Sequence, residues 1–360
     1  MTPRRRVLTA FARRQPDRVP IDYTANPEIT AGLKAHFGLD AADDEGLLKA
    51  LGVDFRMVGA PYVGPKRHAD HGDVRADEWG RRRRWVEHGT GGYWDYCDWP
   101  LRDATVADIE AWALPDPDDY DYAAVADQCA RYGDYFIACG GDGCGDIINS
   151  NGMLRTMAQT LIDLATDEPA GLRLVDRRLE IQFEILRRTL EAGRGRIDLM
   201  RIGEDLGTQI GPLIGLDLFR RHIRPRHQRF VDLAEQYGIG VMIHSCGSSS
   251  WAFDDFIDMG IAVVDTLQPE AKDMAPAYLK RRFGQRLAFH GMMSTAGPVA
   301  YGSVDDVVAN VRATLETMMP GGGYALAPTH ALQSNSPIEN VVAMYAAAAE
   351  FGQYGAADPD

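Results

Sequence analysis

The sequence predicts a (β/α)8 TIM barrel, a fold of the α/β class, on three observations. From about residue 121 onward, short apolar stretches alternate with longer stretches of helical periodicity, at the spacing of strand–helix units. Polar residues follow nearly every apolar stretch, and the carboxyl ends of the strands are where such barrels hold their active sites. The alternative, a doubly wound dinucleotide-binding sheet, needs an early Gly-x-Gly-x-x-Gly run, which is absent from the sequence.

The first third of the chain is irregular and predicts an elaboration packed on the barrel. Apolar residues at helical spacing predict a helix over 3–14 and two more over 27–51, with a short first strand near 19–23. Aromatic, glycine and charged residues without helical period fill 53–100 and favour β-hairpins. The arginine run 81–84 is best explained as a charged, solvated strand edge.

The later part of the chain predicts successive βα units. Strands are expected at 135–139, 197–202, 239–243, 262–266, 287–289 and 323–327. Helices are expected at about 122–132, 150–165, 168–194, 216–237, 249–259, 275–283, 304–319 and 338–351. The glycine run 140–145 lacks the Gly-Lys-Ser/Thr ending of a phosphate loop and is interpreted as a flexible βα loop. We therefore expect an N-terminal elaboration over residues 1–120 and a barrel over 121–360, as one structural unit.

Composition narrows the class of protein. The formal net charge of −14 argues against nucleic acid or an anionic membrane surface as a partner. Five cysteines at irregular spacing make a disulfide framework improbable and indicate a reducing, cytoplasmic location. No apolar run approaches the roughly 18 residues of a membrane span.

A histidine and a cysteine two residues apart end the expected strand 239–243. If the strand continues through them, His244 and Cys246 point to the same face, because strand side chains alternate. One imidazole and one thiol side by side could bind zinc. A hydrogen-bonded core histidine beside a small buried cysteine is the plainer explanation, and on these residues alone it is slightly favoured.

Other polar side chains follow the neighbouring strands, and together they shift that balance toward a site. Each alone has a structural explanation such as a helix cap, but core packing does not require four successive strands to end in polar residues. His330 could supply a third zinc ligand, and Glu204 could be a fourth or an oxygen ligand that substrate displaces, since catalytic zinc characteristically has three protein ligands and an open position. The residues concerned are Glu204, Asp205, Gln209, Asp265, Gln268, His290, His330 and Gln333.

Several motifs resemble the uroporphyrinogen decarboxylase superfamily, and they occur in the same order along most of the chain. Taken together they are specific to the superfamily and less so to one activity within it. They are Asp17-Arg-Val-Pro20, Trp79-Gly80, Gly203-Glu-Asp-Leu-Gly-Thr-Gln209, His244-Ser-Cys-Gly247, Phe289-His-Gly291, Gly321-Gly-Gly-Tyr-Ala-Leu-Ala-Pro-Thr-His330 and Pro337-Ile-Glu-Asn340.

The resemblance implies a (β/α)8 barrel and separates two kinds of chemistry. The decarboxylases use no metal and hold substrate carboxylates with arginines from an N-terminal signature. This chain has Ile21-Asp-Tyr-Thr-Ala-Asn-Pro27 at that place, which lacks them. The zinc-dependent, corrinoid-linked methyltransferases carry a His-x-Cys pair and a later ligand, often cysteine. This chain keeps the pair as His244 and Cys246 but has His330 at the later position, as the decarboxylases do.

The function expected from this resemblance is zinc-dependent methyl transfer between a small methylated substrate, or a thiol, and the cobalt of a corrinoid protein. Zinc is expected on His244 and Cys246, completed by His330 or Glu204. No corrinoid-binding Asp-x-His-x-x-Gly run occurs in the chain, so a partner protein is expected to supply the cobalamin. The expected catalytic residues are Glu204, Asp205 and His290; the expected substrate-binding residues are Gln209, Gln268, Gln333, Tyr62 and Trp79.

Two alternatives stay open at this point. One is a metal-free decarboxylase or lyase on the same barrel, with His330 and Asp205 in acid–base roles. The other is a barrel that binds a corrinoid or another tetrapyrrole without catalysis. Tyr62 and Trp79 could equally be hairpin core, and the methyl donor and a homodimeric assembly are left open by the sequence.

Overall fold

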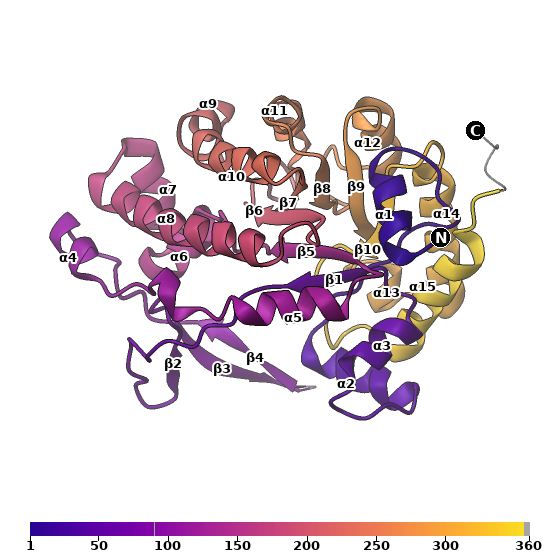
Figure 1. Cartoon of the computed structure of the whole chain (residues 1–360), viewed down its shortest axis with the longest axis horizontal. Coiled ribbons are helices and arrows are strands. Elements are labelled where there is room, and N and C mark those ends of the chain that lie inside the picture. Colours follow the sequence, from indigo (N-terminus) through magenta and orange to yellow (C-terminus); the bar gives the residue numbers. More distant parts are fainter. Residues whose placement is uncertain (90, 356–360) are drawn as a thin grey trace.

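Seven parallel strands form the central sheet of the protein, with helices wrapped around it (Figure 1). The computed structural model describes residues 1–89 and 91–355. The strand order is β1-β5-β6-β7-β8-β9-β10, the sequential order that successive βα units predict. The strands are β1 (Phe55–Val58), β5 (Phe136–Gly140), β6 (Leu199–Gly203), β7 (Gly240–Ser245), β8 (Val263–Thr266), β9 (Ala288–Met293) and β10 (Tyr324–Pro328).

An extended segment at residues 20–22 takes the eighth position and closes the barrel. On one side Leu326 donates its N–H to the Pro20 carbonyl at 2.8 Å, and Asp22 donates to Leu326 at 2.9 Å. On the other side the Asp54 N–H, next to β1, donates to the Ile21 carbonyl at 2.9 Å. Pro20 has no N–H to give, which keeps this pairing short. The first strand predicted near 19–23 is therefore present as a brief bridge between the two edge strands, and the (β/α)8 barrel is confirmed.

The helices follow the predicted alternation. Their apolar residues recur with helical period, which buries one face of each helix against the sheet. The N-terminal region contributes α1 (Pro3–Phe11), α2 (Pro27–His36) and α3 (Asp44–Ala50). The later helices are α4 (Val106–Ala111), α5 (Ala123–Arg131), α6 (Ile148–Arg155), α7 (Met157–Thr166), α8 (Pro169–Ala192), α9 (Leu216–Leu218), α10 (Arg224–Gln236), α11 (Phe253–Met259), α12 (Pro276–Phe283), α13 (Pro298–Tyr301), α14 (Val304–Met318) and α15 (Ile338–Phe351).

The hairpin prediction for 53–100 is right for one part of that region and wrong for another. Strands β2 (Val74–Ala76), β3 (Arg82–His88) and β4 (Gly91–Tyr96) form a small antiparallel sheet. Residues 55–58, however, form β1 and pair with β5 inside the barrel. The alternation at 53–58 is shared by hairpin strands and barrel strands, so it could not separate them.

The arginine run 81–84 lies at the beginning of β3, and its side chains are paired with acids. Arg81 and Arg83 both contact Asp77, at 2.7 and 3.3 Å, and Arg82 contacts Asp98 at 3.3 Å. The predicted strand edge is wrong, because β3 is the central strand of this sheet and pairs with β2 on one side and β4 on the other.

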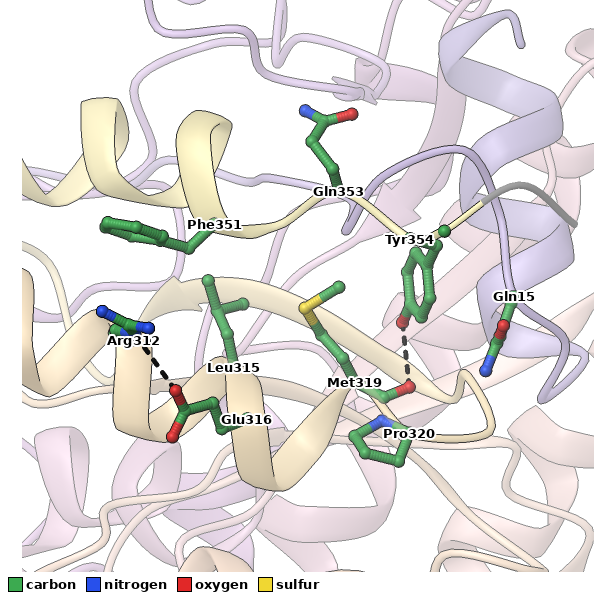
Figure 2. A pocket seen from close by; sticks show the side chains of 10 residues that line it. Gln15, Arg312, Leu315, Glu316, Met319, Pro320, Phe351, Gln353 and Tyr354 are labelled. Atoms are coloured by element: carbon green, nitrogen blue, oxygen red, sulfur yellow. Dashed lines mark hydrogen bonds and ion pairs between the residues drawn. The ribbon is translucent and has the colours of Figure 1, made fainter.

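A groove at the N-terminal end of β10 lies at the opposite end of the barrel from the expected site. Figure 2 shows it between α14 and the segment after α15, with Leu315, Met319, Phe351 and Tyr354 on its walls. The groove has a volume of about 450 Å³. Pro320 and its neighbours in the wall precede β10, so the groove lies where this strand begins. Active sites of such barrels lie where the strands end.

No helix in the described parts of the chain has the length and apolar character needed to cross a bilayer.

Candidate metal centre

The ends of the strands enclose a cavity of about 360 Å³ at the mouth of the barrel. The charged and histidine residues around it come from the extended segment 20–22 and from the strands β5 to β10 or the loops that follow them, which the parallel sheet brings to one edge. Two of the predicted metal ligands, His244 and Cys246, lie in its wall, and His330 lies at its rim. The cavity is lined by Asp22, Tyr23, Thr24, Met57, Asp142, Arg201, Asp205, His244, Cys246, Asp265, Thr266, His290, Ala327, Pro328, His330 and Ala331.

His244 and Cys246 are side by side, as the alternation of strand side chains predicted. His244 lies near the end of β7 and Cys246 directly after it. The Nε2 atom of His244 is 3.4 Å from the Cys246 sulfur. Both side chains are half-buried or more, with His244 only 12% exposed. The two donors therefore face the same small volume.

Asp205 supplies a third donor at the same point. Its Oδ1 atom is 3.8 Å from His244 Nε2 and accepts the Cys246 N–H at 2.8 Å. The donor atoms of Asp205, His244 and Cys246 all lie within 4.8 Å of one another. Ligands of a tetrahedral zinc ion are separated by about 3.4–3.6 Å when the bonds are about 2.0–2.3 Å. One nitrogen, one sulfur and one oxygen grouped in this way fit the donor set of a catalytic zinc ion.

Asp265 holds the other side of the His244 ring. Its Oδ2 atom accepts the hydrogen bond from His244 Nδ1 at 2.8 Å, which leaves Nε2 directed at Cys246. A carboxylate behind a histidine ligand is the usual arrangement that fixes the ring and its tautomer in metal sites. Burial alone would lower the pKa of His244, but the hydrogen bonds with Asp265 and Cys246 hold it well above its usual value.

Asp265 is also the centre of the charge balance. Arg201 donates to its Oδ2 at 2.6 Å and contacts Asp142, in the glycine-rich loop, at 2.5 Å. Burial alone would raise the pKa of Asp265, but the charges of Arg201 and His290 hold it well below its usual value. Asp265 is therefore a carboxylate anion in a fully buried position.

His290 spans two carboxylates. Its Nδ1 donates to Asp265 Oδ1 at 2.5 Å and its Nε2 donates to Asp22 Oδ2 at 3.0 Å. Burial alone would lower the pKa of His290, but the charges and hydrogen bonds of Asp265 and Asp22 raise it to about 9. The ring is thus a buried imidazolium with both N–H groups occupied.

Glu204, predicted as a catalytic residue or ligand, faces away from this group. Its two oxygens accept the N–H groups of Ile147 and Ile148 at 2.9 and 3.0 Å, at the beginning of α6. It is 1% exposed, and burial followed by the charge of Asp146 raises its pKa well above the usual value. Among the described residues, neither group able to hold an ion includes Glu204.

His330 lies on the rim and is exposed. Its Nδ1 contacts only the neighbouring Ala331 carbonyl, at 3.4 Å, among the hydrogen bonds of the described chain. It belongs to neither of the two groups, Asp205–His244–Cys246 and Asp142–His244–Asp265, that bring three donors together in the described residues. Its role as a ligand stays a prediction.

The predicted glutamines are spread around the mouth and are not brought together. Gln268 is turned to the backbone and accepts the Gly247 N–H at 2.7 Å. Gln209 and Gln333 are exposed. None of the three is in the wall of the cavity described above.

The predicted aromatic residues pack in the N-terminal region. The Tyr62 ring packs against Tyr120 at 5.3 Å, and its hydroxyl donates to the Pro65 carbonyl at 2.7 Å. Trp79 is 7% exposed, and its carbonyl accepts the Trp112 N–H. Trp79 lines a second cavity, on the other side of the glycine-rich loop, and neither residue covers the metal-binding group.

Three residues of the mouth were not among the predicted ones. Arg201 interrupts the apolar strand β6, and a charge inside a buried strand was the signal that could have revealed it. The sequence predicts a flexible loop around Asp142 and a short strand around Asp22, and neither prediction indicates a site. Their importance depends on contacts with Asp265 and His290 that are distant in sequence.

The fold and site define a parallel α/β barrel with nitrogen, sulfur and oxygen donors at its mouth. The sequence model of the uroporphyrinogen decarboxylase (URO-D) family matches residues 104–351, and the chain belongs to this family. This confirms the superfamily resemblance inferred from the motifs.

Two proteins similar to this chain are described as methyltransferases. The methylcobamide:CoM methyltransferase MtaA of Methanosarcina barkeri is 28% identical over 139 residues, which are 39% of this chain and 38% of that protein. The match thus spans less than half of the relative. A solved structure of a methyltransferase from Methanosarcina mazei superposes with a TM-score of 0.66 at 20% identity, over 98% of this chain and 99% of that one. At this identity the structural match establishes the shared fold.

Proposed function

We propose that the chain is a zinc-dependent methyltransferase that moves a methyl group between a small methylated substrate, or a thiol, and the cobalt of a corrinoid carried by a separate protein. The observation that carries the proposal is the convergence of His244 Nε2, Cys246 Sγ and Asp205 Oδ1 at one point in the barrel mouth. The similarity to a methylcobamide:CoM methyltransferase supports the reaction class.

His244, Cys246 and Asp205 would hold the ion. Asp205 is better placed for the third position than Glu204, whose oxygens are occupied by α6, or His330, which is exposed. When bound, zinc supplies the Lewis acidity that polarises a methylated heteroatom or makes an acceptor thiol a thiolate at neutral pH. This division of roles differs from the ligand set expected from the resemblance only in its third member.

The surrounding residues position this donor set. Asp265 fixes the His244 ring so that Nε2 faces the cavity, and Arg201 balances the charge of Asp265. His290 donates both N–H groups to carboxylates, so we assign it to holding Asp265 and Asp22 in place. Proton transfer to substrate by His290 would require one of these hydrogen bonds to break.

Metal analysis of the purified full-length protein tests the proposal. We expect about one zinc per chain, and loss of that zinc in His244→Ala and in Cys246→Ser. Cys97→Ser, a cysteine in the hairpin region, is the matched control and should retain zinc. His330→Ala separates the remaining alternative, because zinc retention there supports Asp205 as third ligand.

Activity is measured separately, by following the cobalamin spectrum while methylcobalamin and a panel of thiols are supplied. Demethylation of the cobalamin that depends on zinc supports the proposal. A protein that holds no zinc, and whose turnover is unchanged in His244→Ala and Cys246→Ser, would contradict it.

A further inference from the structure

Arg178 is a buried cation without a counter-ion. It lies on α8 and is 2% exposed. Its Nη1 donates to Asn151 Oδ1 at 2.6 Å and to the Asp146 carbonyl at 3.5 Å, while its Nε has no hydrogen-bond partner. Within the described parts of the chain, no carboxylate oxygen lies within the 4.0 Å of an ion pair. Buried charges are normally paired.

The charges of Asp146 and Glu204 act on Arg178, but neither acid forms an ion pair with it, and Asp146 Oδ1 is a buried oxygen without a hydrogen-bond partner. Glu204 accepts two backbone N–H groups at the beginning of α6, and Asp146 Oδ2 accepts the Ser150 N–H at 2.5 Å. They therefore serve the first turn of the helix. Burial lowers the pKa of Arg178 to about 10, so the guanidinium remains charged at neutral pH.

A cavity of about 330 Å³ lies beside this guanidinium. Trp79, Tyr120 and Leu186 give it aromatic and aliphatic walls, and the glycine-rich loop forms another side. The Arg178 guanidinium is 5.8 Å from the centre of the Trp79 ring. Arg81, the other cation in the wall, is already paired with Asp77 at 2.7 Å. Of the two cations in the wall, Arg178 is therefore the one without an ion pair among the described residues.

We propose that this cavity binds a small organic carboxylate, with its carboxylate on Arg178 and its apolar body against Trp79 and Tyr120. The planar guanidinium matches the geometry of a carboxylate and binds it through parallel hydrogen bonds. The volume is within the range of small-molecule sites, and the mixture of apolar walls with one charged anchor is typical of them.

A second cavity separates this one from the mouth of the barrel. A smaller cavity of about 250 Å³ shares Arg81 and Gly143 with it and is lined on its far side by Asp205 and His244. A ligand anchored on Arg178 therefore lies next to a cavity whose wall includes two residues of the metal-binding group. As an anchor for the methyl donor the site rests on the proposed function, whereas as a carboxylate site it does not.

Calorimetric titration of the full-length protein with benzoate and with its neutral isostere benzamide tests the proposal. We expect benzoate to bind at least tenfold more tightly than benzamide, because hydrogen bonds to charged groups are worth a factor of about ten or more. Arg178→Gln should weaken benzoate binding by a similar factor. Arg173→Gln, an exposed arginine on the same helix that pairs with Glu110, is the matched control and should not.

Two further measurements keep the test decisive. If Arg178→Gln does not fold, the benzoate preference of the wild type is combined with Trp79→Phe, which should abolish a benzoate-induced change in tryptophan fluorescence. Titration of Cys246→Ser separates the site from the metal centre, since carboxylate bound to zinc would be lost there and carboxylate on Arg178 retained. Equal affinity for benzoate and benzamide, or unchanged benzoate affinity in folded Arg178→Gln, would overturn the proposal.

Discussion

Two buried pairings of histidine with carboxylate lie close together in this protein and behave in opposite ways. At the mouth, His244 and His290 both donate to Asp265 at 2.8 and 2.5 Å. Behind it, His227 is 3.7 Å from Glu204 and donates instead to the Gly145 carbonyl at 3.0 Å. The first pairing raises the pKa of His290 to about 9, while burial lowers the pKa of His227 to about 4.

The difference is one of hydrogen-bond partners. The oxygens of Glu204 accept two backbone N–H groups of α6, and burial holds the pKa of Glu204 well above its usual value, so His227 gains no ionic partner and stays neutral. Asp265 instead accepts from two imidazoles and is further stabilised by Arg201. Burial is nearly complete in both places, so burial alone does not set the charge of a histidine. The histidines that contact Asp265 at the mouth are therefore held in the charged form, whereas Glu204 satisfies the N–H groups at the beginning of α6.

The largest expected effect follows from removing the shared charge. In Asp265→Asn, the neutral amide can accept from one imidazole but presents its NH₂ group to the other. Removing one partner of a buried ionic group costs about 3–5 kcal/mol of unfolding free energy. Losing the carboxylate behind a histidine ligand lowers metal affinity by about 10–100-fold. Denaturant unfolding and zinc competition against a chelator measure the two effects.

Asp198→Asn is the control for this prediction. Asp198 is also buried and pairs with Arg4 at 2.8 Å, but at the beginning of β6, away from the mouth. It should lose stability and keep its zinc affinity. Equal zinc affinity in wild type and Asp265→Asn would show that Asp265 has no part in the metal site.

The barrel and the central pair of the site were predictable from the sequence. Strand and helix periods are local, and the two-residue spacing of His244 and Cys246 puts them on one face of any strand that contains them. The position of this pair at the end of a strand predicts that it lies at the mouth of the barrel, because parallel strands bring their carboxyl ends together.

The remainder of the site depends on contacts that the sequence does not encode locally. Glu204 and Asp205 are adjacent, and whether one or the other faces the cavity is decided by which of them α6 captures. Asp22 reaches His290 across 268 residues of sequence. The fate of β1 was equally undetermined, since its neighbours in the sheet are far away in the chain.

An acid-induced loss of stability is expected from His227. Its folded pKa of about 4 lies below the unfolded value of about 6.5, so the unfolded state binds more protons between these values. Its contribution is complete above pH 6.5 and is lost as the pH falls toward 4, by about 3 kcal/mol. In His227→Gln, which keeps a donor for the Gly145 carbonyl, unfolding free energy should depend less on pH across this window. If the slope of unfolding free energy against pH were unchanged in His227→Gln, a group other than His227 would be responsible for the loss of stability.

A smaller loss of stability is expected from Glu204→Gln, which changes the carboxyl partner in the pairing of Glu204 with His227. The amide oxygen can still accept one of the two backbone N–H groups at the beginning of α6. The NH₂ group of the amide then faces the other N–H group, which leaves buried donors unsatisfied. This costs about 1–3 kcal/mol of unfolding free energy. Zinc content should be unchanged, in contrast to His244→Ala. Loss of zinc with retained stability would instead return Glu204 to the ligand set.

The smallest expected effect comes from Asp22→Asn, at the end of the mouth's hydrogen-bond chain. The folded pKa of His290 lies above the unfolded value, so its stabilising contribution is complete below pH 6.5 and is lost between 6.5 and about 9. Asp22 is partly exposed, and Asp265 is the stronger of the two partners. The substitution should therefore lower the pKa of His290 without restoring it to 6.5, at a cost of about 1 kcal/mol. NMR titration of the His290 ring measures this; a fall to 6.5 or below would mean that Asp22, and not Asp265, keeps this histidine charged.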